Sequence, residues 1–181
     1  LSALVHNELG LRQDCFVFDI GLGCSGFVEA WNILESVMEH NELSTALLVT
    51  CDCYSRVIDN DDVNTAPLFG DGAASSLFVR GGPGFRARSW SRGINSSKAG
   101  SLIVQRRHLK MNGREVLNMA IGPALRSLTS LIENQGLEKR TNLDSLVLHQ
   151  GSKYVVDALA KRAGLQDISV GLPSHSYGNL V

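Results

Sequence analysis

The chain has 181 residues, of which 44% are hydrophobic and 19% charged, so it can form a domain with a proper core. Its 17 lysines and arginines nearly balance its 18 aspartates and glutamates, which argues against a globally basic nucleic-acid-binding protein. No run approaches the roughly 20 apolar residues of a membrane-spanning helix. The content of leucine, isoleucine, valine and phenylalanine argues against a disordered chain.

Residues 1–9 have a helix-like pattern and lack the cationic start and apolar stretch of a signal peptide, so we expect a cytoplasmic protein. The chain begins at Leu1 rather than Met and ends directly after Tyr177-Gly178-Asn179, inside what looks like a motif. We therefore expect it to be part of a longer protein.

The cysteines do not make a disulfide framework for a chain of this length, and their apolar surroundings favour reduced thiols. They are Cys15, Cys24, Cys51 and Cys53. Cys51 and Cys53 lack the spacing of a CxxC redox motif, and on a strand their side chains point to the same face. Without a second Cys/His pair at ligand spacing, we expect no metal site.

The first part of the chain predicts strand, helix and strand. Residues 16–20 and 44–50 are short apolar runs that indicate buried strands. Between them, residues 24–40 carry apolar side chains on one helical stripe, namely Phe27, Trp31, Leu34 and Met38. This order predicts a βαβ unit with parallel strands joined by a right-handed crossover.

The middle of the chain is richer in turns. Residues 51–68 are polar and predict a surface loop, after which Phe69-Gly70-Asp71-Gly72-Ala73 turns into a strand over 74–79. Glycines and a proline at 81–84 predict a hairpin into a strand over 85–90. We expect residues 91–110 to be irregular.

The last part alternates again between helix and strand. Residues 111–135 predict a helix that Gly122-Pro123 kinks or splits. Residues 143–148 predict a strand, 153–163 a helix ended by Gly164, and 168–172 a weak strand. Residues 16–40 and 143–163 share the order strand, turn with a reactive residue, helix, which hints at duplicated halves.

Cys24 lies between a predicted strand and the first turn of a predicted helix, flanked by Gly23 and Ser25-Gly26. Unpaired N–H groups at a helix start stabilise a thiolate and can hold an oxyanion formed on an attacked thioester. The alternative is a small cysteine that packs a strand-to-helix turn.

His149 follows a predicted strand, at the end where α/β folds bind ligands. A capping or core histidine is the alternative. Asn179, after Tyr177-Gly178, is by itself an ordinary turn residue. We interpret His175, between two serines, as a loop histidine. Asp71 lies in a glycine-bearing turn, where bonds to backbone N–H groups are a better explanation than metal or base chemistry.

Basic residues are concentrated between Arg86 and Arg114, where eight lysines and arginines occur with no acidic residue. One interpretation is a surface for an anion, such as a phosphorylated cofactor or an acidic protein. The other is an ordinary surface whose charges are balanced by residues such as Asp59 and Asp62. Nucleic acid is disfavoured because Trp90 is the only aromatic residue there.

Five segments in order carry a resemblance to a known family. They are Phe18–Phe27, Phe69–Ala74, Met111–Val116, His149-Gln150 and Tyr177–Asn179. They resemble, in turn, the active-site cysteine segment and the FGDGAGA, MNGxEVF, HQAN and [HY]GNTSAAS motifs of the β-ketoacyl-ACP synthase III family, of the thiolase superfamily. The resemblance spans nearly the whole chain, which would cover the middle of a family subunit.

The resemblance implies an α/β thiolase-like fold with five layers, α-β-α-β-α, built from two similar halves. Residues 1–105 would be the later part of the N-terminal half, and residues 106–181 the first part of the C-terminal half. The family is normally homodimeric, and residues 44–50 would lie near the dimer interface.

The resemblance also implies an activity and a site. Cys24 would take an acyl group from acyl-CoA, and a malonyl-type thioester on acyl carrier protein would then bind and lose CO₂. His149 and Asn179 would hydrogen-bond its carbonyl while the enolate attacks the acyl group, as in fatty-acid or polyketide initiation. Gly113, Gly151 and Ser152, in the same motifs, would bind the coenzyme A thioester, and no cofactor would be tightly bound.

Some residues depart from the family pattern. Ser152 stands in place of the HQAN asparagine, Lys153 and Tyr154 stand where an arginine is usual, and Pro123 interrupts a helix. Two alternatives therefore stay open. One is an acyltransferase that forms an ester without decarboxylation, with His149 as general base. The other is a non-catalytic partner subunit or a truncated fragment.

Overall fold

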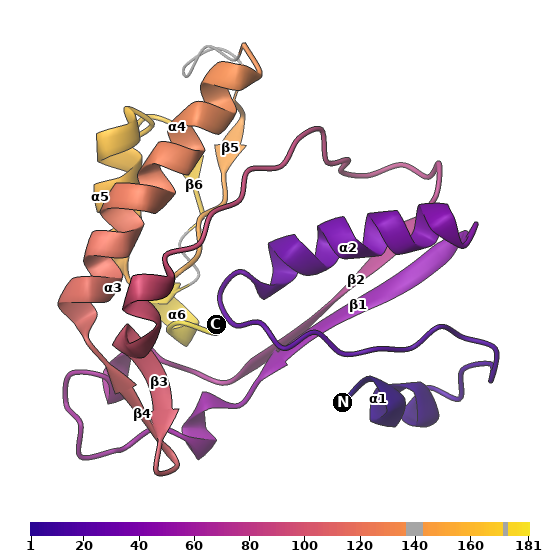
Figure 1. Ribbon diagram of the computed structural model, residues 1–181, viewed down its shortest axis with the longest axis horizontal. Coiled ribbons are helices and arrows are strands. Elements are labelled where there is room, and N and C mark those ends of the chain that lie inside the picture. Colours follow the sequence, from indigo (N-terminus) through magenta and orange to yellow (C-terminus); the bar gives the residue numbers. More distant parts are fainter. Residues whose placement is uncertain (137–142, 172–173) are drawn as a thin grey trace. The chain divides into compact units, whose positions relative to one another are not determined.

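The computed structural model describes residues 1–136, 143–171 and 174–181 (Figure 1). It divides into two compact units, the first made of residues 1–50 and 75–80 and the second of residues 51–74 and 81–181. The boundary predicted between two similar halves lies between residues 105 and 106, where a turn follows a strand of the second unit. The division of the chain into these two halves stays a prediction. None of the helices in the described ranges is long and apolar enough to cross a membrane.

In the first unit, helix α2 (Gly26–His40) packs against strand β2 (Gly72–Val79). Ala30, Leu34 and Met38 recur every four residues and are buried. The predicted stripe is confirmed for Leu34 and Met38, while Trp31 is half-buried and Phe27 is 41% exposed. Trp31 lies edge-on to Phe78 with ring centroids 5.5 Å apart. The short helix α1 (Ser2–Glu8) comes first in the chain.

Strand β1 (Thr45–Asp52) pairs with β2 in a two-stranded sheet. The Arg80 N–H, after the end of β2, donates to the Ser44 carbonyl, before the start of β1, at 2.9 Å. The start of one strand thus lies beside the end of the other, so the pair is antiparallel. The Arg80 guanidinium also donates to the Met38 carbonyl near the C-terminus of α2.

The predicted parallel βαβ unit is wrong for this chain. Residues 16–20 form no strand, and β1 pairs with β2 instead. Phe16 is 63% exposed and Phe18 38%, so this apolar run lies outside any described sheet. An apolar run becomes a strand only where a neighbouring strand takes up its backbone hydrogen bonds.

The second unit is built on helices. Helix α3 (Gly113–Met119) continues through a π turn, η4 (Ala120–Ala124), into α4 (Leu125–Asn134). Pro123 lies inside the π turn, so the expected interruption at Gly122-Pro123 is confirmed. Helix α5 (Lys153–Ala163) begins at the Ser152 cap and ends at Gly164 with φ of 69°, also as predicted.

The core of the second unit lies where α4 and α5 meet a short parallel pair, β5 (Ser145–Leu146) and β6 (Ser169–Val170). Its buried members are Ile132, Leu146, Ala160, Ala163 and Leu165. The predicted strands at 143–148 and 168–172 are therefore present but shorter, and Leu172 lies outside the described residues.

Short helical turns complete this unit. They are η1 (Tyr54–Arg56), η2 (Ala66–Leu68), η3 (Ser96–Ser101) and α6 (Ser174–Tyr177). The expected strand at 85–90 is absent, and Phe85 is 97% exposed, which shows that it packs on no sheet within the described ranges. The expectation of an irregular 91–110 is also wrong, because this stretch contains η3 and an antiparallel hairpin.

That hairpin joins β3 (Leu102–Gln105) to β4 (His108–Met111), with Gln105 opposite His108. Its two-residue turn is Arg106-Arg107, and both residues have positive φ, 50° and 70°. Turns of this kind favour Asn-Gly, because side chains with a Cβ crowd the left-handed backbone. The sequence carries no such signal, which is why the hairpin could not be predicted.

We predict that the double substitution Arg106→Asn/Arg107→Gly stabilises the protein. It removes the left-handed cost of two long side chains, so the free energy of unfolding should rise by about 1 kcal/mol. Urea unfolding measures the change. Arg88→Asn, at an exposed position without positive φ, is the control and should change stability by less than about 0.5 kcal/mol. A double variant no more stable than the control would contradict the prediction.

Candidate active site

Cys24 lies in the turn directly before α2, two residues ahead of the first helical residue. The Gly26 N–H donates to the Gly23 carbonyl at 2.6 Å, which closes this turn. Ser25 is the N-cap and makes no side-chain capping bond to the helix. The thiol is exposed beside a helix start whose N–H groups favour negative charge. The helix predicted to begin at Cys24 is present and begins two residues later, but the strand predicted before Cys24 is absent.

His149 lies in the stretch between β5 and α5, as predicted. A Cβ placed on Gly151 would contact the His149 ring at 3.5 Å from Cδ2 and 3.6 Å from Nε2, so the ring lies over this glycine. The Gln150 amide nitrogen donates to the Leu148 and Gly171 carbonyls, each at 3.0 Å. The first bond joins the two residues that flank His149, and the second joins them to Gly171 in the segment after β6.

Although His149 is exposed in part, the protein atoms around the ring desolvate it and lower the pKa of the imidazole below its ordinary value. The ring is therefore neutral near pH 7. A neutral imidazole has one N–H donor and one acceptor nitrogen.

Asn179 is 5% exposed and is held by its own backbone. Its N–H donates to the Leu68 carbonyl at 2.7 Å, and its carbonyl accepts from the Gly70 N–H at 2.9 Å. These bonds make a parallel bridge between Asn179 and Phe69. The side-chain Oδ1 accepts from the Val181 N–H at 2.9 Å, so Nδ2 is the donor that a ligand could use.

Gly70 and Gly178 allow the backbones on the two sides of the Phe69–Asn179 bridge to approach closely. A Cβ on Gly70 would collide with the Tyr177 carbonyl oxygen. Gly178 has φ of +72°, and a Cβ there would lie 3.2 Å from the Leu68 carbonyl oxygen. The segment Phe69–Ala74 and the segment Tyr177–Asn179, far apart in the sequence, therefore meet backbone to backbone.

Further contacts support the Phe69 side of this bridge. Tyr54 stacks on Phe69 with ring centroids 4.9 Å apart. The Asp71 carboxylate accepts from the Ser55 backbone N–H at 2.8 Å and from the Ser55 hydroxyl, and these bonds lower the pKa of Asp71. Asp71 thus accepts a bond from a backbone N–H, as predicted, but that N–H belongs to Ser55 in another segment rather than to the turn of Asp71 itself. Sequence reasoning missed Tyr54 and Ser55, because no local pattern marks a loop residue that contacts another segment.

The remaining predicted residues lie in the second unit. Gly113 is the first residue of α3, and the Ser152 hydroxyl caps α5 by accepting from the Val155 N–H at 3.3 Å. Gly151 adjoins the His149 ring. The roles of Gly113, Gly151 and Ser152 in binding coenzyme A stay predictions. Cys24 belongs to the first unit, and His149 and Asn179 to the second, so their meeting in one site also stays a prediction.

The basic segment is partly neutralised. Lys98 pairs with Glu115 at 2.6 Å, and Lys110 pairs with Asp59 at 3.5 Å. The second pair agrees with the interpretation that Asp59 and its neighbours balance this charge. Within the described ranges, no group of three or more His, Cys, Asp or Glu side chains could hold a metal ion.

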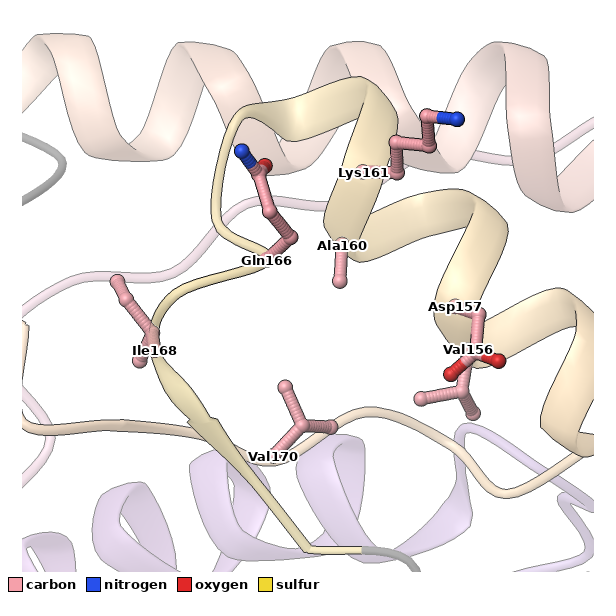
Figure 2. Close-up of a pocket in the computed structure, with 7 residues that line it drawn as sticks. All are labelled: Val156, Asp157, Ala160, Lys161, Gln166, Ile168 and Val170. Carbon is pink, nitrogen blue, oxygen red and sulfur yellow. The ribbon is translucent and has the colours of Figure 1, made fainter.

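A cavity of about 490 Å³ lies between α5 and the segment leading into β6 (Figure 2). Its lining residues are Val156, Asp157, Ala160, Lys161, Gln166, Ile168 and Val170. Figure 2 shows that Val156 and Val170 supply apolar walls, and that the polar ends of Lys161 and Gln166 point in different directions. Neither His149 nor Asn179 lines it, so this cavity is separate from the predicted site residues.

The sequence and the fold of this chain were compared with those of known proteins. Residues 18–92 match the family model of 3-oxoacyl-[acyl-carrier-protein (ACP)] synthase III. The β-ketoacyl-[acyl-carrier-protein] synthase III of Coxiella burnetii is 32% identical over 187 residues, covering 98% of this chain and 58% of that protein. The crystal structure of the Thermus thermophilus synthase III is 29% identical, with a TM-score of 0.85, and covers 98% of this chain and 58% of that one.

A second solved 3-oxoacyl-(acyl-carrier-protein) synthase III has a TM-score of 0.90 at 24% identity, covering 99% of this chain and 60% of that one, and supports the fold alone. The fold class is therefore confirmed as an α/β, thiolase-like fold. Within this class, the chain is similar to proteins of the β-ketoacyl-ACP synthase III family, and residues 18–92 match that family's model. It spans 58% of the length of the Coxiella burnetii protein and 54% of the length of the Streptococcus equi relative.

We predict that Gly70→Ala destabilises the second unit. The added Cβ meets the Tyr177 carbonyl, so the segment carrying Asn179 must shift, at a cost of about 1–3 kcal/mol in the free energy of unfolding. Urea unfolding measures this. Gly100→Ala is the control, because a Cβ there meets nothing within 4 Å. If both variants lost the same free energy of unfolding, the close contact between Gly70 and the Tyr177 carbonyl would be contradicted.

We predict that His149 titrates below about 6.5, the usual value for histidine. Since folding lowers its pKa, the associated stability is fully present above that value and is lost as pH falls toward the folded pKa. NMR titration of the ring, assigned with the His149→Gln variant, measures the midpoint in buffer and in urea. A folded-state midpoint equal to or above the urea value would contradict desolvation of the ring.

Proposed function

We propose that the protein is an acyl-thioester condensing enzyme of the β-ketoacyl-ACP synthase III type. The observation that carries this proposal is the position of Cys24 at the start of α2, within the segment that matches the family model. An exposed thiol beside a helix start suits a soft nucleophile for a thioester carbonyl. The proposed partners are acyl-CoA and acyl carrier protein, the proposed assembly is a homodimer, and the proposed location is the cytoplasm.

In the first half-reaction, the Cys24 thiolate attacks the carbonyl carbon of acyl-CoA. The tetrahedral oxyanion collapses, the carbon–sulfur bond to coenzyme A breaks, and the coenzyme A thiolate leaves and takes up a proton. N–H groups at the start of α2 favour the thiolate and the oxyanion.

In the second half-reaction, a malonyl-type thioester loses CO₂, and its carbon–carbon bond electrons form an enolate. The N–H of neutral His149 and Nδ2 of Asn179 donate to the thioester oxygen as negative charge develops there. The enolate carbon then attacks the acyl group on Cys24, and the thiolate leaves. The lowered pKa of His149 supports this role, because the ring stays neutral near pH 7.

The same lowered pKa also fits the alternative of ester formation. An unprotonated imidazole can accept a proton from an alcohol that attacks acyl-Cys24. The two reactions differ in their products, because only condensation releases CO₂ from a malonyl thioester.

We predict that acyl-CoA acylates Cys24 and that His149→Ala and Asn179→Ala acylate normally but lose decarboxylation by about 10²–10³-fold. Intact-mass analysis follows the adduct, peptide mapping locates it, and release of labelled CO₂ from malonyl carrier protein follows the second step. Cys24→Ser is the control that should take no acyl group.

The outcomes separate the alternatives. Acylation of Cys24 with ester formation from an alcohol and no CO₂ would favour the acyltransferase. No adduct on Cys24 with any acyl-CoA tested would contradict the enzyme proposal and favour a non-catalytic subunit.

A further inference from the structure

Two neighbouring thiols lie outside the proposed catalytic residues. Cys51 is the last residue but one of β1, and Cys53 follows the strand directly. Both are exposed, and neither is in a disulfide. Side chains two residues apart on a strand point to the same face, so these two thiols flank Asp52 on one side of the chain.

The two thiols interact. Although Cys51 is exposed, partial desolvation by surrounding protein atoms is the main cause that raises the pKa of its thiol, and its interaction with Cys53 raises it further. The neighbouring carboxylates of Asp52 and Asp71 act in the same direction.

We propose that Cys51 and Cys53 form a reversible oxidation site that closes to an intramolecular disulfide. Two residues of extended strand span about 6.6 Å, at the upper end of the roughly 4.4–6.8 Å between Cα atoms in disulfides. Closure therefore bends the end of β1, and a bond under such strain is readily reduced again. This proposal is independent of the proposed condensing function.

The oxidant is a small disulfide such as oxidised glutathione. The Cys53 thiolate attacks one glutathione sulfur, the glutathione disulfide bond breaks, and a glutathione thiolate leaves and is protonated. Cys51 then loses its proton and attacks the Cys53 sulfur, which expels the second glutathione. The protein loses two hydrogen atoms and two electrons, and two glutathione thiols are formed. Cys53 attacks first because the raised pKa of Cys51 disfavours its thiolate.

Disulfide formation between Cys51 and Cys53 would affect the segment around Phe69, which pairs with Asn179. Cys53 is the N-cap of η1, and its carbonyl accepts from the Arg56 N–H at 3.2 Å. The same turn carries Tyr54, which stacks on Phe69, the residue bridged to Asn179. Bending the end of β1 therefore strains the contacts that hold the Phe69–Asn179 bridge.

The test uses a glutathione redox buffer of increasing oxidation, followed by alkylation of remaining thiols and mass spectrometry. Cys51 and Cys53 should together escape alkylation, with a loss of two hydrogens on one peptide, and dithiothreitol should reverse it. Cys51→Ser should instead keep one glutathione on Cys53, because the resolving thiol is missing. Hydrogen exchange over residues 68–70 and 177–181 should increase at least twofold on oxidation of the wild type.

The Cys51→Ser/Cys53→Ser variant is the matched control and should show no change in exchange on oxidation. Three outcomes would overturn the proposal: full alkylation of both thiols in the most oxidising buffer, persistent glutathione on both, or pairing of either thiol with Cys15 or Cys24. Peptide mapping distinguishes these outcomes, and none depends on catalytic activity.

Discussion

The backbone bridge between Asn179 and Phe69 is the constraint on which the candidate site of the second unit depends. It brings together two segments far apart in the sequence through bonds to Leu68 and Gly70. The approach is so close that Gly70 has no space for a Cβ, and Gly178 must adopt a left-handed backbone. The two glycine-bearing motifs are thus halves of one structural feature, which positions a buried amide donor.

The environments of the three proposed site residues differ in kind. Cys24 lies at a helix start, where peptide dipoles favour an anion. His149 lies where surrounding atoms remove water, which favours a neutral ring. Asn179 is neutral at all pH values and is oriented by its own backbone. The proposed nucleophile therefore lies where negative charge is favoured, while the two proposed donors are neutral near pH 7.

The sequence predicted features that depend on neighbouring residues. Helix α5 with its end at Gly164, the interruption at Pro123 and the helix that follows Cys24 are all predicted by local patterns. Sequence-based prediction was wrong where the structure of a segment depends on a distant segment. The apolar run at 16–20 was predicted to be a strand, but it pairs with no strand within the described ranges. The Tyr54 and Ser55 contacts were missed for the same reason, since contacts between distant segments leave no local periodicity.

Neutral donors matter for the proposed decarboxylation because catalysis requires stronger binding of the transition state than of the substrate. A charged imidazolium near the substrate carboxylate would stabilise the group that must leave as CO₂. A neutral N–H instead interacts most strongly with the thioester oxygen, where charge appears only as the bond breaks. Desolvation of His149 therefore has a chemical consequence as well as a cost in stability at low pH, since the same lowered pKa keeps the ring a selective donor.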